Sequence, residues 1–360
     1  MNMKIGKIDN ETLERLVLGR TGAKRDEVIV GPGIGEDCAV LDFGEYECVL
    51  STDPITAGAS RVGTLAVHIS CNDVASNGVE PMAIMLTVLL PPSVTEKEIE
   101  EIARQADEAA KELGVQIIGG HTEVTDIVTQ PLISAVAIGR KTKEDVPCVS
   151  VIAAGSRRLP ADLSFSPPTR SREDSVHAAR LVPGDLIIVT KKLALEGTAL
   201  AAERKEKELK PYLTEEELAY AMDMIRRISV VKEGVIAGRM GIETMHDVTE
   251  GGVLGAVWEV CECAGVGAVI EAGSLPFDEV TMTICAVLGL DPMRLISSGS
   301  MLMCVPERLL EEVSEALSDA GIELSIIGRV TERESGATLV FRNGERETIG
   351  PPGPDEIYSI

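Results

Sequence analysis

Residues 68–81 read His68-Ile69-Ser70-Cys71-Asn72-Asp73-Val74-Ala75-Ser76-Asn77-Gly78-Val79-Glu80-Pro81. The strongly polar side chains of Asn72 and Asp73 stand among apolar residues such as Ile69, Val74 and Ala75. Hydrophobic spacing predicts a helix over residues 64–78. A polar group on or near a buried helical face costs about 1–3 kcal/mol unless it has a partner. Asn72 and Asp73 are therefore candidate site residues.

Glycine or a strand end stands beside a carboxylate in four further short segments. They are Gly35-Glu36-Asp37, Thr52-Asp53-Pro54, Gly119-Gly120-His121-Thr122-Glu123 and Asp247-Val248-Thr249-Glu250-Gly251-Gly252. Magnesium prefers oxygen ligands, and glycine lets backbone N–H groups approach phosphate oxygens. One such segment is weak evidence, because an acid at a helix start is more often an N-cap. Together they predict a site for a metal ion and phosphates.

The elements on either side of these segments indicate an α+β protein. Strands and helices alternate up to about residue 140, including a helix over residues 96–113 with a capping box at Thr95 and Glu98, and a strand over 115–118 that opens onto the Gly119–Glu123 segment as a loop. A similar order returns after residue 185, with a helix expected over 215–240. We predict an N-terminal domain over 1–147, a flexible insertion over 148–181, a C-terminal domain over 182–345 and an extended tail over 346–360.

Composition excludes several classes of protein. Hydrophobic residues make up 44% of the chain and aromatic residues 2%, which predicts an aliphatic core. A net charge of -24 argues against nucleic-acid binding. No signal peptide or membrane-length apolar stretch occurs, and the eight cysteines form no CxxC pair, so we expect a cytoplasmic protein with reduced, mostly buried thiols and no membrane contact.

The motifs, in this order and spacing, resemble the superfamily of aminoimidazole ribonucleotide synthetase, selenophosphate synthetase, thiamine-monophosphate kinase and HypE. Residues 68–81 are similar to its H-x-S-x-N-D-[VI]-A-x-x-G-x-x-P stretch, and 35–40 to its G-[DE]-D-[AC]-A-V motif. Residues 119–123 resemble its GGDT/GGHTE segment, and 247–252 its D-x-T-x-GG motif. Residues 288–302 resemble a region of the HypE family.

The resemblance implies two PurM-like domains, α/β sandwiches whose N-terminal mixed sheets carry helices on one face and join into a barrel in a homodimer. It implies ATP and Mg²⁺ bound between the domains. Magnesium or phosphate-site acids would be Asp37, Asp53, Asp73 and Asp247; nucleotide-lining residues would be Gly35, Asn72, Gly119, Gly120, Thr122, Gly251 and Gly252. We assign His121 and Glu123 as candidate catalytic residues, although His121, like His246, could also be an ordinary hydrogen-bonded histidine.

The implied reaction is ATP-dependent activation of a carbonyl or amide oxygen on a small or protein-bound acceptor, as in hydrogenase maturation, with a maturation-factor protein as a further partner. The Pro-Arg-Ile-Cys tail of the HypE family is not matched by Asp355-Glu356-Ile357-Tyr358-Ser359-Ile360, so the thiol-borne carbamoyl chemistry is not carried over. Two alternatives stay open: a cyclo-ligase of purine synthesis, which the missing DGVGTK segment disfavours, and a non-catalytic ATP-binding regulatory module.

Overall fold

The computed structural model describes residues 8, 10–33, 36–56, 59–142 and 181–360, and the expected insertion at 148–181 lies outside it except for Leu181. Among these residues the N-terminal half holds a six-stranded mixed sheet in the order β1-β2-β3-β6-β4-β5, in which β4 and β5 are parallel. Its strands are β1 (Val28–Val30), β2 (Ala39–Phe43), β3 (Tyr46–Ile55), β4 (Pro81–Leu90), β5 (Gln116–Val124) and β6 (Leu132–Thr142).

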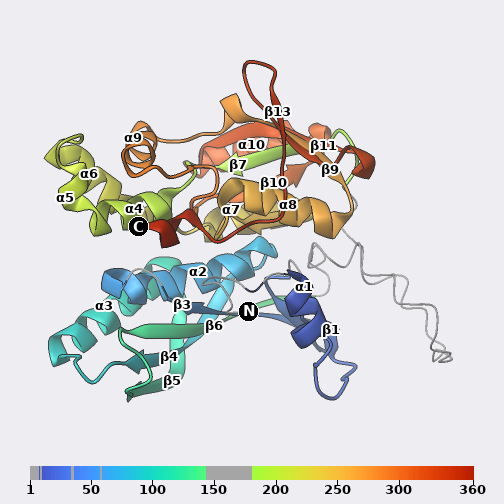
Figure 1. Ribbon diagram of the computed structural model, residues 1–360. Coiled ribbons are helices and arrows are strands. Elements are labelled where there is room, and N and C mark those ends of the chain that lie inside the picture. The colour runs from blue at the N-terminus through green and yellow to red at the C-terminus, as the bar shows by residue number, and fades with distance from the viewer. Residues whose placement is uncertain (1–7, 9, 34–35, 57–58, 143–180) are drawn as a thin grey trace.

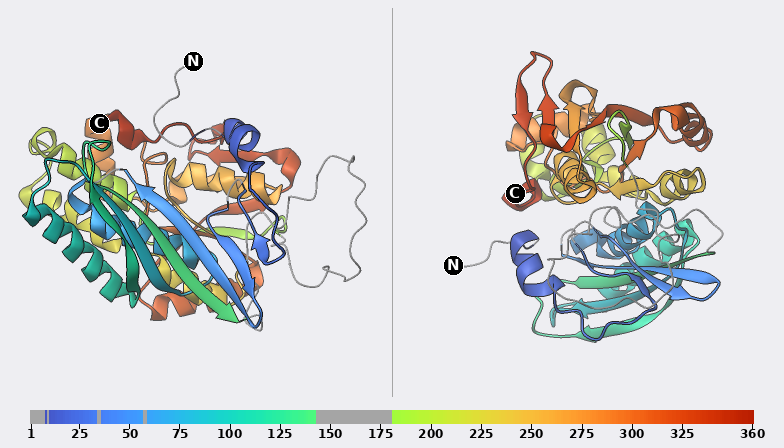
Figure 2. Two further views of the ribbon diagram at one scale, coloured as in Figure 1. Left: turned by 90° about the horizontal axis from the view of Figure 1, so that it is seen from below. Right: turned by 90° about the vertical axis from the view of Figure 1, so that its right-hand side faces the viewer.

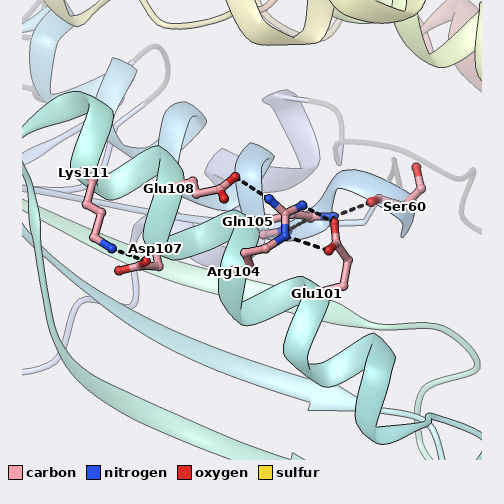
Figure 3. A network of polar contacts seen from close by, with 8 residues as sticks. Ser60, Glu101, Arg104, Gln105, Asp107, Glu108 and Lys111 are labelled. Atoms are coloured by element: carbon pink, nitrogen blue, oxygen red, sulfur yellow. Dashed lines mark hydrogen bonds and ion pairs between the residues drawn. The ribbon is translucent and has the colours of Figure 1, made fainter.

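Two long helices, α2 (Val62–Ser76) and α3 (Glu96–Leu113), cover one face of this sheet (Figure 1). The predicted capping box starts α3 at Thr95, and Gly114 ends the helix at a φ of 69°. Figure 3 shows the exposed ion pairs of Arg104 with Glu101 and Glu108 on α3. Buried Gln105 does more: it donates to Ser60 O (2.7 Å) and accepts from the N–H of Gly63 (3.2 Å), which fixes the start of α2 against α3.

The described C-terminal half holds a seven-stranded sheet in the order β13-β12-β9-β11-β7-β10-β8. Its strands are β7 (Leu186–Thr190), β8 (Thr244–Asp247), β9 (Gly267–Glu271), β10 (Met301–Val305), β11 (Leu324–Thr331), β12 (Ala337–Val340) and β13 (Arg346–Thr348). Its helices are α4 (Leu195–Arg204), α5 (Glu206–Leu209), α6 (Glu215–Asp223), α7 (Val231–Arg239), α8 (Gly252–Ala264), α9 (Glu279–Leu288) and α10 (Leu310–Asp319). The expected α+β class, with two domains and helices on one face of the first sheet, is confirmed.

Helix α2 lies between the first sheet and the C-terminal half, so it belongs to the core of both (Figures 1 and 2). All of its residues except Thr64 are buried. One hydrophobic cluster joins α2 side chains such as Leu65 to Leu195 and Ile228 of the C-terminal half. Where α2 meets α7 the backbones nearly touch: a Cβ on Gly234 would lie 2.3 Å from Ala75 O, and one on Gly238 would lie 2.5 Å from Gly78 Cα.

Three expectations about elements differ from the structure. Residues 215–240 form α6, a 3-10 turn (Met224–Arg227) and α7 instead of one helix. The Gly119–Glu123 segment is part of strand β5 because it pairs with β4, and is not a loop. The tail is not simply extended, since Arg346–Thr348 pairs with β12 and Glu356–Ser359 forms a 3-10 turn. Within the described residues, no helix has the length and apolar character needed to span a bilayer.

Candidate functional site

Four aspartates from separate elements converge at the junction of the two halves. Asp73 lies in α2, Asp53 in β3, Asp37 just before β2 and Asp247 at the end of β8. Asp73 is only 4% exposed. Burial is the largest influence on its pKa, and the charges of the three other aspartates add to it, so this pKa lies well above the ordinary value. Ligand atoms of Asp37 and Asp247 lie within 4.8 Å of each other. The four expected metal residues are thus brought together.

Strand alternation and helix α2 explain how this cluster forms. Ser51 and Asp53 are two residues apart on β3, so both side chains point to the face that α2 covers. The Ser51 hydroxyl donates to Asp73 Oδ2 at 2.5 Å, and the Cys38 thiol donates to Asp73 O at 3.2 Å. These bonds attach β3 and the segment before β2 to the last turn of α2.

His246, next to Asp247, joins the cluster from the C-terminal half. Its Nδ1 lies 3.0 Å from Asp37 Oδ2, and its Nε2 lies 2.9 Å from Glu259 Oε2 on α8. Burial by itself lowers the pKa of His246, but the two carboxylates outweigh that effect and this pKa lies well above its ordinary value. Asp37, His246 and Asp247 together could hold a metal ion. Because both ring nitrogens of His246 already face carboxylates, the ligands that remain in the cluster are oxygen atoms. Such a donor set suits a hard cation such as Mg²⁺ better than a nitrogen-seeking metal.

The Asn72 amide, expected to line the nucleotide, bonds the backbone of the C-terminal half. Its Nδ2 donates to Ile228 O at 2.8 Å, and its Oδ1 accepts from the N–H of Val230 at 2.8 Å. The side chain is 0% exposed. Asn72 therefore holds the segment before α7 against α2, and both ends of its amide are engaged by backbone of the C-terminal half.

The candidate catalytic pair lies away from the aspartates. His121 Nε2 and Glu123 Oε2 are 3.0 Å apart on the edge strand β5, and both side chains are exposed. The register runs from Pro54 through Ser134 and Thr87 to His121, so three strand spacings of about 4.8 Å separate β3 from His121.

The same register decides which face of the sheet each side chain occupies. Directly paired residues share a face, so His121 shares that of Pro54, which is opposite to the face of Asp53. Glu123 lies on the face of His121, and Thr122 lies on the other face. Within one chain the structure does not bring His121 or Glu123 to the aspartate cluster.

The glycines expected at the nucleotide lie in two separate places in the structure. Gly119 and Gly120 lie in β5, where a Cβ on Gly120 would sit 1.8 Å from Leu86 O, so pairing with β4 alone requires glycine there. Gly251 and Gly252 start α8 at φ values of 85° and 63°. Gly35 lies outside the described residues.

Sequence reasoning missed the tail. The Asp355 carboxylate accepts three backbone N–H bonds, from Gly251 (2.7 Å), Ile296 (3.1 Å) and Ile357 (2.8 Å). Burial raises the pKa of Asp355 despite these bonds. The Tyr358 hydroxyl donates to Glu250 Oε1 at 2.7 Å. A tail carboxylate thus occupies the N-terminus of α8, where phosphate was expected, and no sequence signal marked it.

Comparison with known proteins follows this architecture. The AIR synthase related protein N-terminal domain model matches residues 35–141, and the C-terminal domain model matches 182–340. A putative hydrogenase expression/formation protein of Methanocaldococcus jannaschii is 28% identical, over 97% of this chain and 96% of that protein. Carbamoyl dehydratase HypE of Rhizobium leguminosarum bv. viciae is 26% identical, over 82% of this chain and 77% of that protein.

Solved structures share the fold. The HypE–HypF complex contains a chain with a TM-score of 0.70 and 22% identity, covering 89% of this chain and 94% of that chain. HypE in complex with ATP gives a TM-score of 0.68 and 20% identity, covering 97% of this chain and 92% of that chain. The domain models, the relatives and the structures agree with the motif order. The chain belongs to the AIR synthase-related family and is a HypE-like member of it.

Proposed function

We propose that this chain is an ATP- and Mg²⁺-dependent enzyme of the HypE type, which activates a carbonyl or amide oxygen of a small or protein-bound acceptor during hydrogenase maturation. The observation that carries the proposal is the convergence of Asp37, Asp53, Asp73 and Asp247 at the junction of the halves. Relatives named carbamoyl dehydratase, and a HypE structure that contains ATP, support the same reaction class.

The aspartate cluster suits a magnesium–nucleotide complex. Four carboxylates crowded at a buried position repel one another, and a divalent cation relieves that repulsion. Bound Mg²⁺ would neutralise charge on the phosphates as the γ-phosphoryl group is transferred. The residues of this chain would hold and orient the magnesium–nucleotide complex. Helix α2 and strand β3 fix Asp73 and Asp53, and β8 supplies Asp247 from the other half.

Phosphoryl transfer to the acceptor oxygen converts a poor leaving group into a phosphate. In the proposal the bond between the γ-phosphorus and the ADP oxygen breaks as the acceptor oxygen bonds to that phosphorus. The carbon–oxygen bond of the acceptor then breaks and the oxygen leaves as part of phosphate; for an amide, the nitrogen gives up its two protons as the carbon–nitrogen triple bond forms. Catalysis of this kind depends mainly on positioning and on charge neutralisation. The roles of Gly35, Gly119, Gly120, Thr122, Gly251 and Gly252 at the nucleotide remain proposals, and Gly251 would have to exchange its bond to Asp355 for one to phosphate.

We also propose a homodimer formed through the first sheet. The face away from α2 and α3, together with the edge strand β5, carries exposed large apolar side chains. These are Phe43, Tyr46, Met82, Met85, Ile117, Ile118 and Val124. His121 and Glu123 can take part in catalysis only if such a dimer brings them to a second subunit's site. A maturation-factor protein partner, as in the HypE–HypF complex, and a cytoplasmic location complete the proposal.

Calorimetric titration with ATP tests the function, with and without Mg²⁺, on the wild type and on Asp73→Asn. Asparagine retains an acceptor for Ser51 but lacks the charge, so we expect a loss of Mg²⁺-dependent ATP affinity of at least about tenfold, with unchanged circular dichroism. Asp107→Asn, at an exposed ion pair on α3, is the matched control and should bind as the wild type does. ATP binding that ignores both Mg²⁺ and Asp73→Asn would contradict the proposal.

A further inference from the structure

Asp37 differs from the other three aspartates in how it is held. Asp53 lies within a strand, Asp73 within a helix and Asp247 at the end of a strand, so regular backbone hydrogen bonding fixes each of them. Asp37 precedes β2 in a segment without regular secondary structure. Its carboxylate needs a side-chain contact to stay within 4.8 Å of the Asp247 ligand atom.

His246 provides that contact from the opposite half of the molecule. Its Nδ1 is 3.0 Å from Asp37 Oδ2 and its Nε2 is 2.9 Å from Glu259 Oε2. Each ring nitrogen thus lies within hydrogen-bonding distance of one carboxylate oxygen. The His246 side chain is 7% exposed and is held from both sides, by Asp37 of the N-terminal half and by Glu259 of α8.

Glu259 orients the ring, and the ring orients Asp37. Carboxylate–histidine pairs behind the ligands of metal sites fix ligand direction in this way, and their loss costs about 10–100-fold in metal affinity or activity. The Glu259 side chain is half-buried at the edge of the cluster, 13 residues after His246, and comes from a different element. The arrangement Glu259–His246–Asp37 therefore runs from α8 through β8 to the N-terminal half.

We propose that His246, supported by Glu259, is the positioning residue that delivers Asp37 to the cation site when the two halves are together. This inference rests on the proposed function, since it assigns a role within the same site. His246 is not a cation ligand in this arrangement, because both of its nitrogens are bonded to carboxylates. Its contribution is the direction and position of one carboxylate.

Two substitutions of nearly equal size separate positioning from simple packing. The amide nitrogen of asparagine can take the place of Nδ1, so His246→Asn keeps a donor for Asp37 and loses the bond to Glu259. The longer glutamine reaches the place of Nε2, so His246→Gln keeps the bond to Glu259 and loses Asp37. Glu259→Gln, at a less buried position, keeps the shape of the support and removes its charge.

The measurement is a titration of the full-length protein with Mn²⁺, followed by electron paramagnetic resonance in the presence of ATP, with melting temperature recorded in parallel. We expect His246→Gln to weaken Mn²⁺ about 10–100-fold, and His246→Asn and Glu259→Gln to weaken it only a few-fold. A purely structural role would lower the melting temperature of the two His246 variants alike and leave Mn²⁺ affinity the same in both, which would overturn the inference.

Failure of the proposed function looks different. In that case the wild type itself would bind no Mn²⁺ with ATP, or Asp73→Asn would bind it as tightly as the wild type. Wild-type binding that is sensitive to Asp73→Asn but insensitive to His246→Gln would refute only the positioning role. If His246→Gln does not fold, Glu259→Gln decides: unchanged Mn²⁺ affinity overturns the inference, and a loss of a few-fold supports it.

Discussion

Replacing Asn72 by alanine should lower the free energy of unfolding and make the two halves of the molecule unfold less cooperatively. The substitution removes the bonds to Ile228 O and Val230 N–H, both 2.8 Å long, from a side chain that is 0% exposed. Ile228 and Val230 are themselves buried, so water cannot readily replace the lost partners. Each unsatisfied buried backbone group costs about 1–3 kcal/mol, which gives a loss of about 2–6 kcal/mol. That is a large part of the total free energy of unfolding of a native protein, which is usually about 5–15 kcal/mol.

The assay exploits the single tryptophan, Trp258, which lies in α8 of the C-terminal half. Urea unfolding followed by Trp258 fluorescence reports on that half, whereas circular dichroism reports on both. In the wild type the two transitions should coincide, because α2 belongs to both cores. In Asn72→Ala we expect a lower midpoint and two transitions that no longer coincide.

Asn77→Ala is the matched control, because Asn77 is the residue that ends α2 and its Nδ2 donates to Asp73 O over 3.2 Å within the same half. We expect it to cost about 1 kcal/mol and to leave the transitions together. A loss below about 1 kcal/mol for Asn72→Ala, or a loss no larger than that of Asn77→Ala, would refute the coupling role of Asn72.

Two further predictions concern packing and pH. Gly238→Ala places a methyl group 2.5 Å from Gly78 Cα, and backbone cannot move aside as a side chain can. After the gain in helix propensity is subtracted, we expect the free energy of urea unfolding to fall by about 1–2 kcal/mol. Gly350→Ala, where a Cβ would meet no atom within 4 Å, should leave it unchanged. Burial, with the charges of Asp355 and Glu250, raises the pKa of Glu196 from 4.5 to about 7. The folded state therefore holds the proton more tightly, and stability falls as pH rises from about 4.5 to 7, by about 3 kcal/mol in all. Glu196→Gln should abolish that fall. The melting temperatures of the wild type and the variant at pH 4.5 and 7.5 test this, and equal changes with pH in the two proteins would contradict it.

Local signals in the sequence were enough to predict several elements, and the resemblance supplied the four aspartates that the structure brings together. The capping box at Thr95 and Gly114 fixed the bounds of α3, because both act within one turn of the helix. Asp73 could be singled out because an ionisable group in an apolar helix is costly without a purpose. The order and spacing of the glycine–acid segments, which resemble the family motifs, supplied Asp37, Asp53 and Asp247, and the structure places their side chains near Asp73.

Contacts between distant residues could not be predicted in this way. The hydrogen-bond partners of Asn72 lie 156 and 158 residues away, so nothing near it in the sequence indicated that its amide bonds the C-terminal half. The face of His121 depends on the register of four strands, including an irregularity in the pairing of β4 with β5 between Ile84 and Met85. One residue of slip reverses the face of every side chain. Asp355 looked like an ordinary tail acid until its three donors were placed around it.

The position of α2 has a consequence for handling the protein. A helix buried on nearly every side has no polar face to offer water, so a fragment that ends before the second sheet would expose an apolar surface and should aggregate when expressed alone. The complementary fragment would lose the helix against which Gly234 and Gly238 pack. We therefore expect that neither sequence domain can be produced alone, and that a divided chain has to be studied by co-expression of both pieces.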